Sequence, residues 1–400
     1  MKKSVLFLVQ NLPVPQDRRV WMEAKTLREN GFLVSVISPR KKDQKKKEEI
    51  DGIHIYRYLE APKAHGYMSY FWEYLYSYLM TFYLAIKIYF KRGFSIIHTA
   101  NPPDFFFSIA LIFRLFGVKF VYDQHDLMPE MMLCKFYKNK DSFFYKLLLM
   151  FERLSYKTCA VHIATCRSGQ EKVLSRVKIK PKNFIVRSAP DLGQINMTLV
   201  NELKSKEAKK RFSYLGAYIG VMGPQDGVDK LLRSLRIIVH DFKRNDIGFV
   251  LMGDGDDFER LVRMSQELEI ENNVIFTGWA DKEIISTYLF SSVIGLMPEP
   301  KNDYTDNSLH NKVLEYMSAG LPIVSYDLKE ARTSAEDAAI YIKGNNEKEF
   351  ARAVVFLADN PEMRKKMGEK GKARIEEKFN SSFSKEELMK AYDSLFPEIN

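Results

Sequence analysis

Hydrophobic and polar positions follow a repeated strand–helix pattern along this chain. Short apolar runs at 5–9, 33–37, 119–123 and 294–297 indicate buried strands, and segments with apolar residues every three or four positions lie between them. This alternation predicts an α/β protein in which helices connect parallel strands by right-handed crossovers. A length of 400 residues is sufficient for two domains of this kind.

The first strand leads into a helix that we expect over 18–30. Asp17 is a plausible N-cap for this helix. No GxGxxG follows the strand, so the pattern does not favour a bound dinucleotide. Arg18 and Arg19 begin the helix at the carboxyl edge of the predicted sheet. Two interpretations stay open for them: a solvated helix start, or a grip on the phosphate of an acceptor substrate.

The stretch between 67 and 90 is the most aromatic part of the chain. Its large apolar residues share one helical stripe, formed by Trp72, Leu75, Tyr76, Leu79, Phe82, Tyr83 and Ile86. The uncharged run inside the stretch has 13 residues, whereas a membrane-spanning helix needs about 20. We therefore expect no transmembrane segment. The stripe either packs on the core or lies in a membrane interface, where Trp and Tyr are favoured.

The stretch 298–324 carries the strongest local signals, PEPKNDYTDNSLHNKVLEYMSAGLPIV. It predicts a polar loop at the carboxyl end of a strand, then a helix that Gly320 ends, then another strand. Such a loop binds anions in open α/β sheets. Lys312, in the first turn, opposes the helix dipole unless it meets a negative ligand. Glu315, one turn further on, can accept two ribose hydroxyls, and Ser308 is a candidate helix cap.

This stretch resembles the donor-binding signature of retaining nucleotide-sugar glycosyltransferases of family 4, which have the GT-B fold. In that signature two Glu flank seven residues at a loop-to-helix junction. The second Glu matches Glu315 and the sequence AGLPIV at 319–324 matches the tail, whereas the first Glu position falls on Asn307. The Asn-Lys-x-x-Glu-Tyr-Met version resembles a bacterial subgroup that builds surface polysaccharides.

The resemblance extends along nearly the whole chain and implies two Rossmann-like domains that face a cleft. Residues 1–190 are the expected acceptor-binding domain, 191–212 a linker, and 213–382 the nucleotide-sugar-binding domain. The last helix, within about 383–400, crosses back to pack on the first domain. These expectations give the chain an α/β fold of GT-B architecture.

The resemblance also implies the donor site. Gly220 and Gly223 allow close approach of a phosphate after the first strand of the second domain. Most family members carry an Arg and a Lys in this turn, at positions that are Val221 and Asp226 here. The diphosphate then depends on backbone N–H groups, Lys312 or an Arg of the first domain. The predicted donor-binding residues are Gly220, Gly223, Trp279, Ala280, Ser308, Leu309, His310, Lys312 and Glu315.

His125 lies in a loop at the carboxyl edge of the first domain, where family members carry a His that contacts the donor sugar. We predict His125, Asn307 and Lys312 as catalytic residues. The predicted acceptor-binding residues are Asp17, Arg18 and Arg19. The resemblance implies transfer with retained configuration. The matched loops show no obvious nucleophile and no carboxylate pair at glycosidase spacing, so we expect a front-face mechanism.

Charge and cysteine content refine this picture. Residues 1–190 hold 32 Lys and Arg against 16 Asp and Glu, whereas residues 191–400 hold 29 against 35. A basic, aromatic first half indicates a negatively charged partner, for which we expect an anionic membrane rather than nucleic acid. The three Cys fit a reduced cytosol, and the absence of CxxC or HExxH predicts no metal and no cofactor besides the co-substrate.

The resemblance implies a glycosyltransferase, and the basic, aromatic first half places the expected enzyme in the cytoplasm, on the inner face of the membrane. It moves a hexosyl or N-acetylhexosaminyl group from a nucleotide diphosphate sugar, expected to be UDP-linked, to a lipid-diphosphate-linked or glycan acceptor. The expected pathway is capsule, O-antigen or exopolysaccharide synthesis. Two alternatives stay open: a nucleotide-sugar 2-epimerase of the same fold, and a non-catalytic partner subunit that kept the fold.

Overall fold

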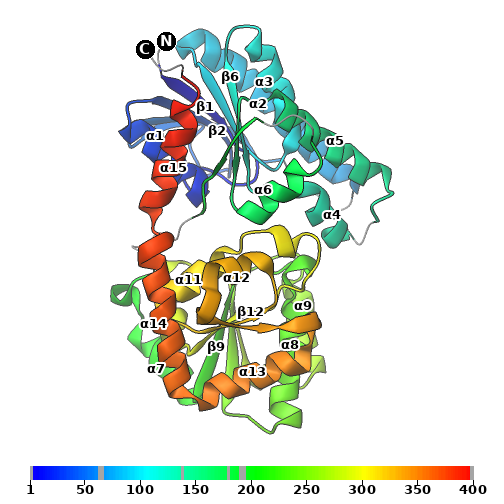
Figure 1. The fold of residues 1–400 in the computed structure, drawn as a ribbon, viewed down its shortest axis with the longest axis vertical. Helices are drawn as coiled ribbons and strands as arrows, with labels where there is room; N and C mark the ends of the chain where they lie inside the picture. Colours follow the sequence, from blue (N-terminus) through cyan, green and yellow to red (C-terminus); the bar gives the residue numbers. More distant parts are fainter. Residues whose placement is uncertain (1–2, 62–66, 137–138, 178–180, 189–194, 397–400) are drawn as a thin grey trace. The chain divides into compact units, whose positions relative to one another are not determined.

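The structure is a computed structural model that describes residues 3–61, 67–136, 139–177, 181–188 and 195–396 (Figure 1). The chain divides into two compact units. The first consists of residues 1–133, 138–187 and 384–400, and the second of residues 134–137 and 188–383. Each unit is an α/β sandwich built around one sheet, as the alternating pattern predicts.

The first unit contains an eight-stranded sheet with the order β3-β4-β2-β1-β5-β6-β7-β8. Every neighbouring pair is parallel except β3 and β4. The strands are β1 Ser4–Leu8, β2 Leu33–Arg40, β3 Lys47–Ile50, β4 Ile53–Leu59, β5 Ile96–Ala100, β6 Lys119–Gln124, β7 Val161–Ala164 and β8 Lys182–Ile185.

Helices cover both faces of this sheet. One core cluster joins Val20 of α1 and Leu388 of α15 to Val5 of β1, so the last helix crosses back to the first unit as predicted. On the other face, Tyr122 of β6 contacts Tyr156 of α5, with ring centroids 6.3 Å apart. The helices are α1 Arg18–Glu29, α2 Tyr67–Arg92, α3 Phe107–Arg114, α4 Met128–Phe136, α5 Phe143–Thr158, α6 Arg167–Leu174 and α15 Ser381–Asp393.

The second unit contains a six-stranded, wholly parallel sheet with the order β11-β10-β9-β12-β13-β14. This order reverses at β9, because the chain first builds outward to β11 and then returns to place β12 on the other side. Open α/β sheets bind ligands at the carboxyl ends next to such a reversal. The strands are β9 Tyr214–Ile219, β10 Ile247–Met252, β11 Val274–Gly278, β12 Ile294–Met297, β13 Ile323–Tyr326 and β14 Ala339–Ile342.

The helices of the second unit include one where we predicted a linker. Residues 202–211 form α7, and Ala208 of this helix and the following Phe212 belong to the core of the unit. The linker prediction over 191–212 is therefore wrong for α7, and residues 189–194 lie outside the described residues. The helices are α7 Glu202–Arg211, α8 Val228–Arg236, α9 Phe258–Glu267, α10 Lys282–Ser291, α11 Asn311–Ala319, α12 Lys329–Ala335, α13 Glu347–Asp359 and α14 Pro361–Lys378.

The β12–α11–β13 segment follows the sequence-based prediction closely. Val313, Leu314 and Met317 of α11 are buried, and Gly320 ends the helix with φ 74°, a conformation that glycine adopts without strain. The N-cap position belongs to His310, whose side chain makes no cap bond. The prediction that Ser308 caps this helix is therefore wrong.

We found no helix in the described part of the chain that combines the length and the apolar character needed to cross a membrane. The longest helix, α2, has 26 residues. This result agrees with the sequence-based rejection of a spanning segment.

Candidate active site

Three glycines lie at the carboxyl ends of neighbouring strands in the second unit. Gly220 follows β9, Gly253 follows β10, and Gly278 ends β11. The N–H of Gly253 donates to the carbonyl of Gly278 at 3.0 Å. A Cβ on Gly253 would lie 1.9 Å from the carbonyl oxygen of Gly220, so only glycine permits this approach. The strand ends therefore present main chain rather than side chains.

Lys312 brings a positive charge to this strand edge. It is the second residue of α11 and is buried. Its Nζ lies 4.2 Å from the centroid of the Tyr218 ring, within the range of a cation–π contact. A Cβ on Gly220 would lie 3.0 Å from the same nitrogen. The structure thus brings together Gly220 and Lys312, two residues of the predicted donor site.

Glu299 is a further residue of this site that the sequence analysis did not single out. It follows β12 by two positions, is 2% exposed and forms an ion pair with Lys312. Its other carboxylate oxygen, Oε2, has no hydrogen-bond partner among the described residues. We expected a Lys312 whose charge only a bound anion would compensate, but a protein carboxylate already does so. The sequence could have indicated this ion pair, because a Glu beside a buried strand end needs a partner for its charge.

The loop between β12 and α11 is held by its own hydrogen bonds. Asn307, predicted as catalytic, is buried and donates through Nδ2 to the carbonyl of Asp303 at 2.9 Å. Ser308 donates to the carbonyl four residues before it, at 2.8 Å. His310 Nε2 lies 3.0 Å from a main-chain carbonyl, and burial lowers the pKa of His310, so the ring is neutral near pH 7. The loop therefore has a fixed shape before any ligand binds.

The remaining predicted donor residues surround this loop and the end of β11. Glu315 is half-buried one turn into α11, and Leu309 is half-buried just before the helix. Trp279 is 81% exposed directly after β11, and the next residue, Ala280, is half-buried. An exposed indole beside a main-chain floor is suited to cover a planar ring such as a nucleotide base.

The turn after β9 differs from the expectation. The carboxylate of Asp226 accepts from the N–H of Gly223 and from the side-chain amide of Gln225, both at 3.0 Å. The N–H of Gly223 is therefore committed to the turn, and the close approach of a phosphate that we predict at Gly220 and Gly223 stays a prediction. Val221 is 62% exposed. The Asp226 carboxylate thus has a structural role, because it closes the turn in which most family members place a cation.

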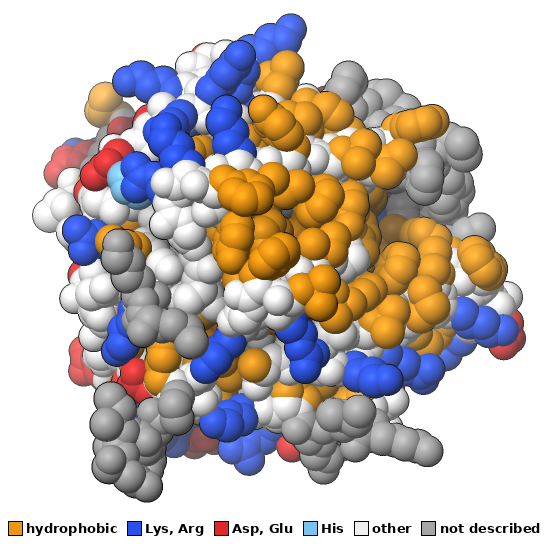
Figure 2. All heavy atoms as spheres, turned by 90° about the horizontal axis from the view of Figure 1, so that it is seen from above, with side chains coloured by type: hydrophobic (Ala, Val, Ile, Leu, Met, Phe, Trp, Pro, Cys, Tyr) orange, Lys and Arg blue, Asp and Glu red, His pale blue; other side chains and the backbone are white. Residues whose placement is uncertain are grey.

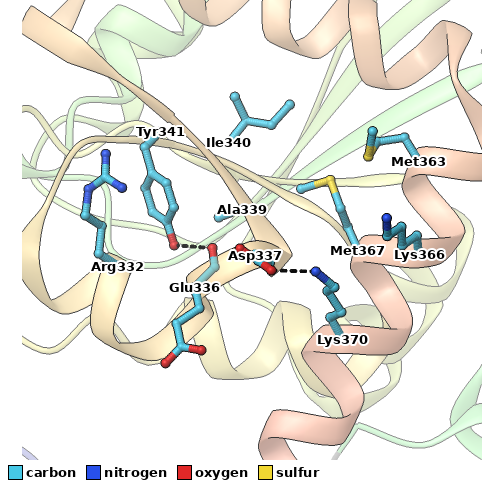
Figure 3. Close-up of a pocket in the computed structure, with 10 residues that line it drawn as sticks. All are labelled: Arg332, Glu336, Asp337, Ala339, Ile340, Tyr341, Met363, Lys366, Met367 and Lys370. Atoms are coloured by element: carbon cyan, nitrogen blue, oxygen red, sulfur yellow. Dashed lines mark hydrogen bonds and ion pairs between the residues drawn. The ribbon is translucent and has the colours of Figure 1, made fainter.

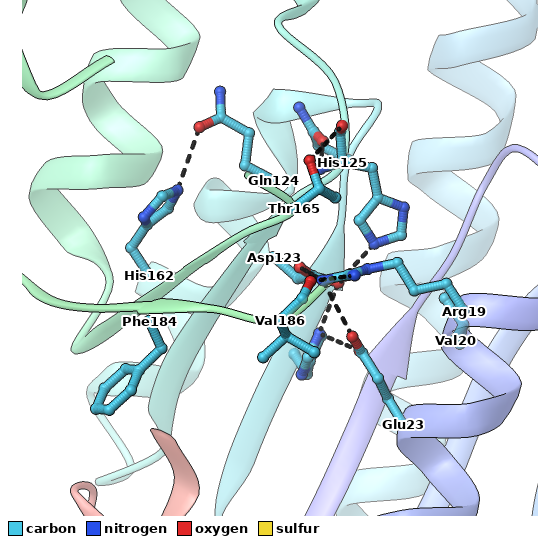
Figure 4. A network of polar contacts seen from close by, with 12 residues as sticks. Arg19, Val20, Glu23, Asp123, Gln124, His125, His162, Thr165, Phe184 and Val186 are labelled. Carbon is cyan, nitrogen blue, oxygen red and sulfur yellow. Dashed lines mark hydrogen bonds and ion pairs between the residues drawn. The ribbon is translucent and has the colours of Figure 1, made fainter. Parts of the chain in front are cut away.

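Asp123 lies at the centre of a buried charge network in the first unit (Figure 4). Its carboxylate accepts from Arg19 at 2.7 and 3.1 Å, and its Oδ2 lies 2.5 Å from Nε2 of His125. Burial alone would raise the pKa of Asp123, but Arg19 and His125 outweigh burial and hold this pKa well below its usual value. Asp123 is therefore a permanent anion that orients two predicted site residues.

Arg19 serves the interior of the first unit. It is 8% exposed, donates to the carbonyl of Val186 at 2.5 Å and lies 3.2 Å from Glu23. The sequence analysis offered a solvated helix start or a grip on acceptor phosphate, and the structure contradicts both for this residue. Arg18 is exposed. Asp17 accepts from the third N–H after it at 3.1 Å, which confirms it as the N-cap of α1.

His125 is held in place through its main chain as well as its ring. Asn101, which sequence reasoning did not assign to the site, accepts through Oδ1 from the N–H of His125 at 2.5 Å and of Asp126 at 3.1 Å. Burial lowers the pKa of His125, but the carboxylate of Asp123 outweighs burial and raises this pKa above its usual value. The ring therefore favours the imidazolium, with Nε2–H directed to Asp123.

Glu23 and His98 complete the network below Asp123. Burial, and then the charge of Asp123, raise the pKa of Glu23 to about 8, so Glu23 carries a proton near neutral pH. His98 Nε2 lies 3.4 Å from Glu23, and its Nδ1 lies 2.8 Å from the hydroxyl of Tyr392 on α15. Glu23, His98 and Asp123 are close enough to share a metal ion. A cation there would face the guanidinium of Arg19, so these residues fit an ion-pair network better than a metal site.

A cavity of about 570 Å³ lies elsewhere in the second unit (Figure 3). It is bordered by the edge strand β14, the short helix before that strand, and α14. Lys370 pairs with Asp337 there, and the guanidinium of Arg332 lies 4.3 Å from the ring of Tyr341. The cavity adjoins the amino end of β14, whereas Gly220 and Lys312 lie at carboxyl ends. It is therefore separate from the candidate donor site.

Two family models match the chain, one in each half. A model described as Glycosyltransferase Family 4 matches residues 16–187, and a model described as Glycosyl transferases group 1 matches residues 200–374. Together with the two parallel sheets, these matches define a GT-B glycosyltransferase fold. The chain belongs to the glycosyltransferases that combine a family 4 domain with a group 1 domain.

The curated relatives and solved structures are distant in sequence. An uncharacterized glycosyltransferase of Methanocaldococcus jannaschii is 25% identical over 261 residues, which cover 65% of this chain and 64% of that protein. The chitobiosyldiphosphodolichol beta-mannosyltransferase of Candida glabrata is 21% identical over 73% of this chain and 69% of that protein. The match covers 64%, 54% and 59% of the length of three uncharacterized glycosyltransferases among these relatives, which is less than two thirds of each. The Anabaena HepE structure with UDP and glucose has a TM-score of 0.74 at 13% identity, covers 98% of this chain and 100% of that one, and shows the same fold.

Proposed function

We propose that this protein transfers a hexosyl or N-acetylhexosaminyl group from a nucleotide diphosphate sugar to a lipid-diphosphate-linked or glycan acceptor. The observation that carries the proposal is the position of Lys312 Nζ beside Gly220 at the carboxyl end of β9. A buried cation beside half-buried glycine main chain at this sheet edge suits the diphosphate of a donor. Glu315, on the same helix as Lys312, is placed to accept the ribose hydroxyls.

The proposed reaction breaks the bond between the anomeric carbon and the diphosphate oxygen, and forms a bond from an acceptor oxygen to that carbon. Attack on the face that the diphosphate leaves retains the anomeric configuration. The leaving diphosphate takes the acceptor proton, so no protein base is required. Lys312 stabilises the negative charge that develops on the diphosphate, and His125, held by Asp123, contacts the sugar as a hydrogen-bond donor.

The proposed setting is the inner face of a bacterial cytoplasmic membrane, in the synthesis of capsule, O-antigen or exopolysaccharide. Two considerations support it: the formal charge of +16 on residues 1–190, and the lipid-diphosphate named for the Candida glabrata relative. UDP-linked sugars are the first donors to test, because the Anabaena structure of the same fold holds UDP and glucose. No metal enters the proposed reaction.

The deciding experiment supplies the purified protein with UDP-, GDP- and dTDP-linked sugars, with and without a polyprenyl-diphosphate sugar. We expect free nucleoside diphosphate and a longer lipid-linked glycan from one donor class only, with the new linkage assigned by NMR. Conversion of the donor to its 2-epimer without an acceptor would favour the epimerase. Release of no nucleotide from any donor, in a protein that still binds nucleotides, would favour a non-catalytic subunit.

A further inference from the structure

Helix α2 presents its large apolar side chains to solvent. The residues of α2 that are buried are Ser77, Thr81, Ala85 and Ile88. Trp72 is 61% exposed and Phe90 is 85% exposed, and Leu79, Tyr83 and Ile86 between them are exposed too. A helix on a sheet normally buries its apolar stripe, whereas four of the seven stripe residues of α2 are exposed. Leu75, Tyr76 and Phe82 of the stripe are half-buried, and the Tyr76 ring lies 6.2 Å from that of the buried Tyr58, so the stripe packs on the core only in part.

The exposed apolar surface continues onto α3 and α5. Tyr89 of α2 packs against Phe113 and Phe116, with ring centroids 5.2 and 5.6 Å apart, and Phe107 of α3 lies 6.4 Å from Phe151 of α5. Figure 2 shows hydrophobic side chains gathered over one continuous area, with Lys and Arg side chains beside it. We call the exposed apolar residues of α2, α3 and α5 the apolar face: Trp72, Leu79, Tyr83, Ile86, Phe90, Leu111, Ile112, Leu115, Phe116, Phe143, Phe144 and Met150.

The exposed charges on the helices of the apolar face have one sign, and Asp141 just before α5 is an exposed acidic residue next to it. The two acidic residues of these helices are not exposed, because Glu73 is half-buried and accepts from Gln10, and Glu152 is buried and paired with Arg176. The exposed charged residues of α2, α3 and α5 are Lys87, Lys91, Arg92, Arg114, Lys146, Arg153 and Lys157. An apolar surface bordered by seven cations and one acidic residue is complementary to an anionic bilayer, which offers both hydrocarbon and negative headgroups.

A cavity of about 310 Å³ opens beside the apolar face, between the ends of α3 and α5. Its lining includes Arg114, Lys119 and Lys157 and no Asp or Glu. Lys119 also donates to the carbonyl of Leu395. The two helix C-termini bring about half a negative charge each, so three cations leave the cavity positive by about two charges. A doubly charged cavity next to exposed Leu115 and Phe116 fits a phosphate that is attached to an acyl chain.

We propose that the apolar face docks on an anionic lipid bilayer and that the cavity of Arg114, Lys119 and Lys157 binds the phosphate of a lipid headgroup. This proposal rests on the proposed function only in the purpose that it gives to membrane docking, which is to bring the enzyme to a lipid-linked acceptor. The membrane supplies the apolar contact along α2, and the headgroup phosphate fixes how the first unit is oriented on the surface.

The experiment measures flotation of the full chain with vesicles of phosphatidylcholine containing 30% phosphatidylglycerol, and with phosphatidylcholine alone. Each Lys or Arg near an anionic surface contributes about 1 kcal/mol, so the loss of any two of these charges should weaken binding about 30-fold, and Arg114→Gln with Lys157→Gln should weaken it further because the bound phosphate is lost as well. Lys87→Gln with Lys91→Gln removes the same charge from the same face without touching the cavity, and we expect a smaller loss. Equal losses would show a diffuse charge effect and overturn the headgroup site.

The apolar contact is tested by Leu115→Ser with Phe116→Ser, which should weaken the part of the binding that resists high salt. Phe90→Ser is a second variant, chosen because this side chain is 85% exposed and its loss leaves the core intact. Phe356→Ser, exposed on α13 of the second unit, is the matched control. Unchanged binding in both variants, or assembly of the wild type into oligomers in place of flotation, would overturn the docking surface.

Transfer to a water-soluble acceptor separates this proposal from the proposed function. All surface variants should retain that activity, because none of them changes the candidate active site. A protein that floats but transfers no sugar would refute the proposed function and leave the docking surface standing. A protein that transfers sugar but does not float would refute the docking surface and leave the proposed function standing.

Discussion

The carboxylate of Asp123 holds the ring of His125 at 2.5 Å while it pairs with the guanidinium of Arg19. One buried anion therefore fixes both the helix that follows β1 and the loop that follows β6. The structure gives His125 a raised pKa because of this neighbour, in spite of burial. The catalytic contribution that we propose for His125 then depends on Asp123, a residue that need not touch the substrate.

We predict that His125→Ala abolishes sugar transfer and leaves nucleotide binding nearly intact, because the nucleotide site that we propose lies on the second unit. Asp123→Asn removes the carboxylate charge and should lower the pKa of His125. The decline of kcat/KM at high pH should then move to lower pH in Asp123→Asn relative to the wild type, since fewer rings are protonated at each pH.

The variants must first be shown to be folded under the conditions of the assay. Loss of one partner of a buried ion pair costs about 3–5 kcal/mol, so the pH profile of Asp123→Asn is measured well below its melting temperature. His125→Gln should lack the shifted decline altogether. An Asp123→Asn profile that coincides with the wild-type profile would show that Asp123 is structural only, and full transfer activity in His125→Ala would remove His125 from the site.

Glu23 provides a pH-dependent stability that can be measured without substrate. Its pKa is about 8 in the folded protein, against a usual value of 4.5. A group with a raised pKa contributes its full stability below pH 4.5 and loses that contribution as the pH rises toward 8. Glu23→Gln keeps the shape and stays neutral, so its free energy of unfolding should lack this decline.

The measurement is urea unfolding of both proteins at several pH values between 4.5 and 8. The difference in the free energy of unfolding should change by up to about 1.4 kcal/mol per pH unit in that window, in favour of Glu23→Gln at the higher pH. Glu377→Gln, at an exposed position on α14, is the matched control and should show no such trend. A constant difference across the window would show that Glu23 is ionised throughout.

The sequence predicted the local architecture around the donor site well. The strand at 294–297, the buried face of α11 and the stop at Gly320 each depend on neighbouring residues, so a local pattern suffices. The helix α7 was missed because its sequence is mostly polar and its packing depends on Ala208. The stripe of α2 was recognised, but a period of 3.6 defines a face without saying whether that face is buried.

Contacts between residues far apart in the sequence account for the other differences between the sequence-based prediction and the structure. Arg19 donates a hydrogen bond to Asp123, 104 positions later, and no sequence pattern near Arg19 indicates that partner. Asn101 locks the His125 loop across 24 positions. The membrane attachment, the donor and the acceptor stay predictions, because they concern molecules outside the chain.

Glu315 should bind the ribose of the donor nucleotide. It is half-buried one turn into α11, the position that the family signature gives to its second Glu. Loss of a charged hydrogen-bond partner costs about 1.5–3 kcal/mol, so Glu315→Ala should weaken nucleotide binding roughly ten- to a hundredfold. Calorimetry with UDP measures this, with Asn311→Ala at the exposed start of the same helix as the control. An affinity equal to that of the control would sink the assignment.

The ion pair between Lys312 and Glu299 predicts a competition for one cation. The diphosphate of the donor and the carboxylate of Glu299 both seek the charge of Lys312, and Glu299 is placed to repel the diphosphate as well. Glu299→Gln removes the competing charge and keeps the shape. It should therefore raise the affinity for UDP and leave the affinity for uridine unchanged, because uridine has no phosphate.

Lys312→Met gives the opposite change but also leaves Glu299 buried without its partner, which costs about 3–5 kcal/mol of stability. The double variant Lys312→Met with Glu299→Gln avoids this loss and isolates the missing cation. We expect it to bind uridine like the wild type, to bind UDP more weakly, and to lower kcat most, because the charge on the diphosphate grows as the sugar leaves. Calorimetry with UDP and uridine, together with initial rates of transfer, tests these expectations on Glu299→Gln, Lys312→Met and the double variant. If UDP affinity and kcat stay at wild-type values in the double variant, the diphosphate is held elsewhere, and Arg18, exposed at the start of α1, is the next cation to replace.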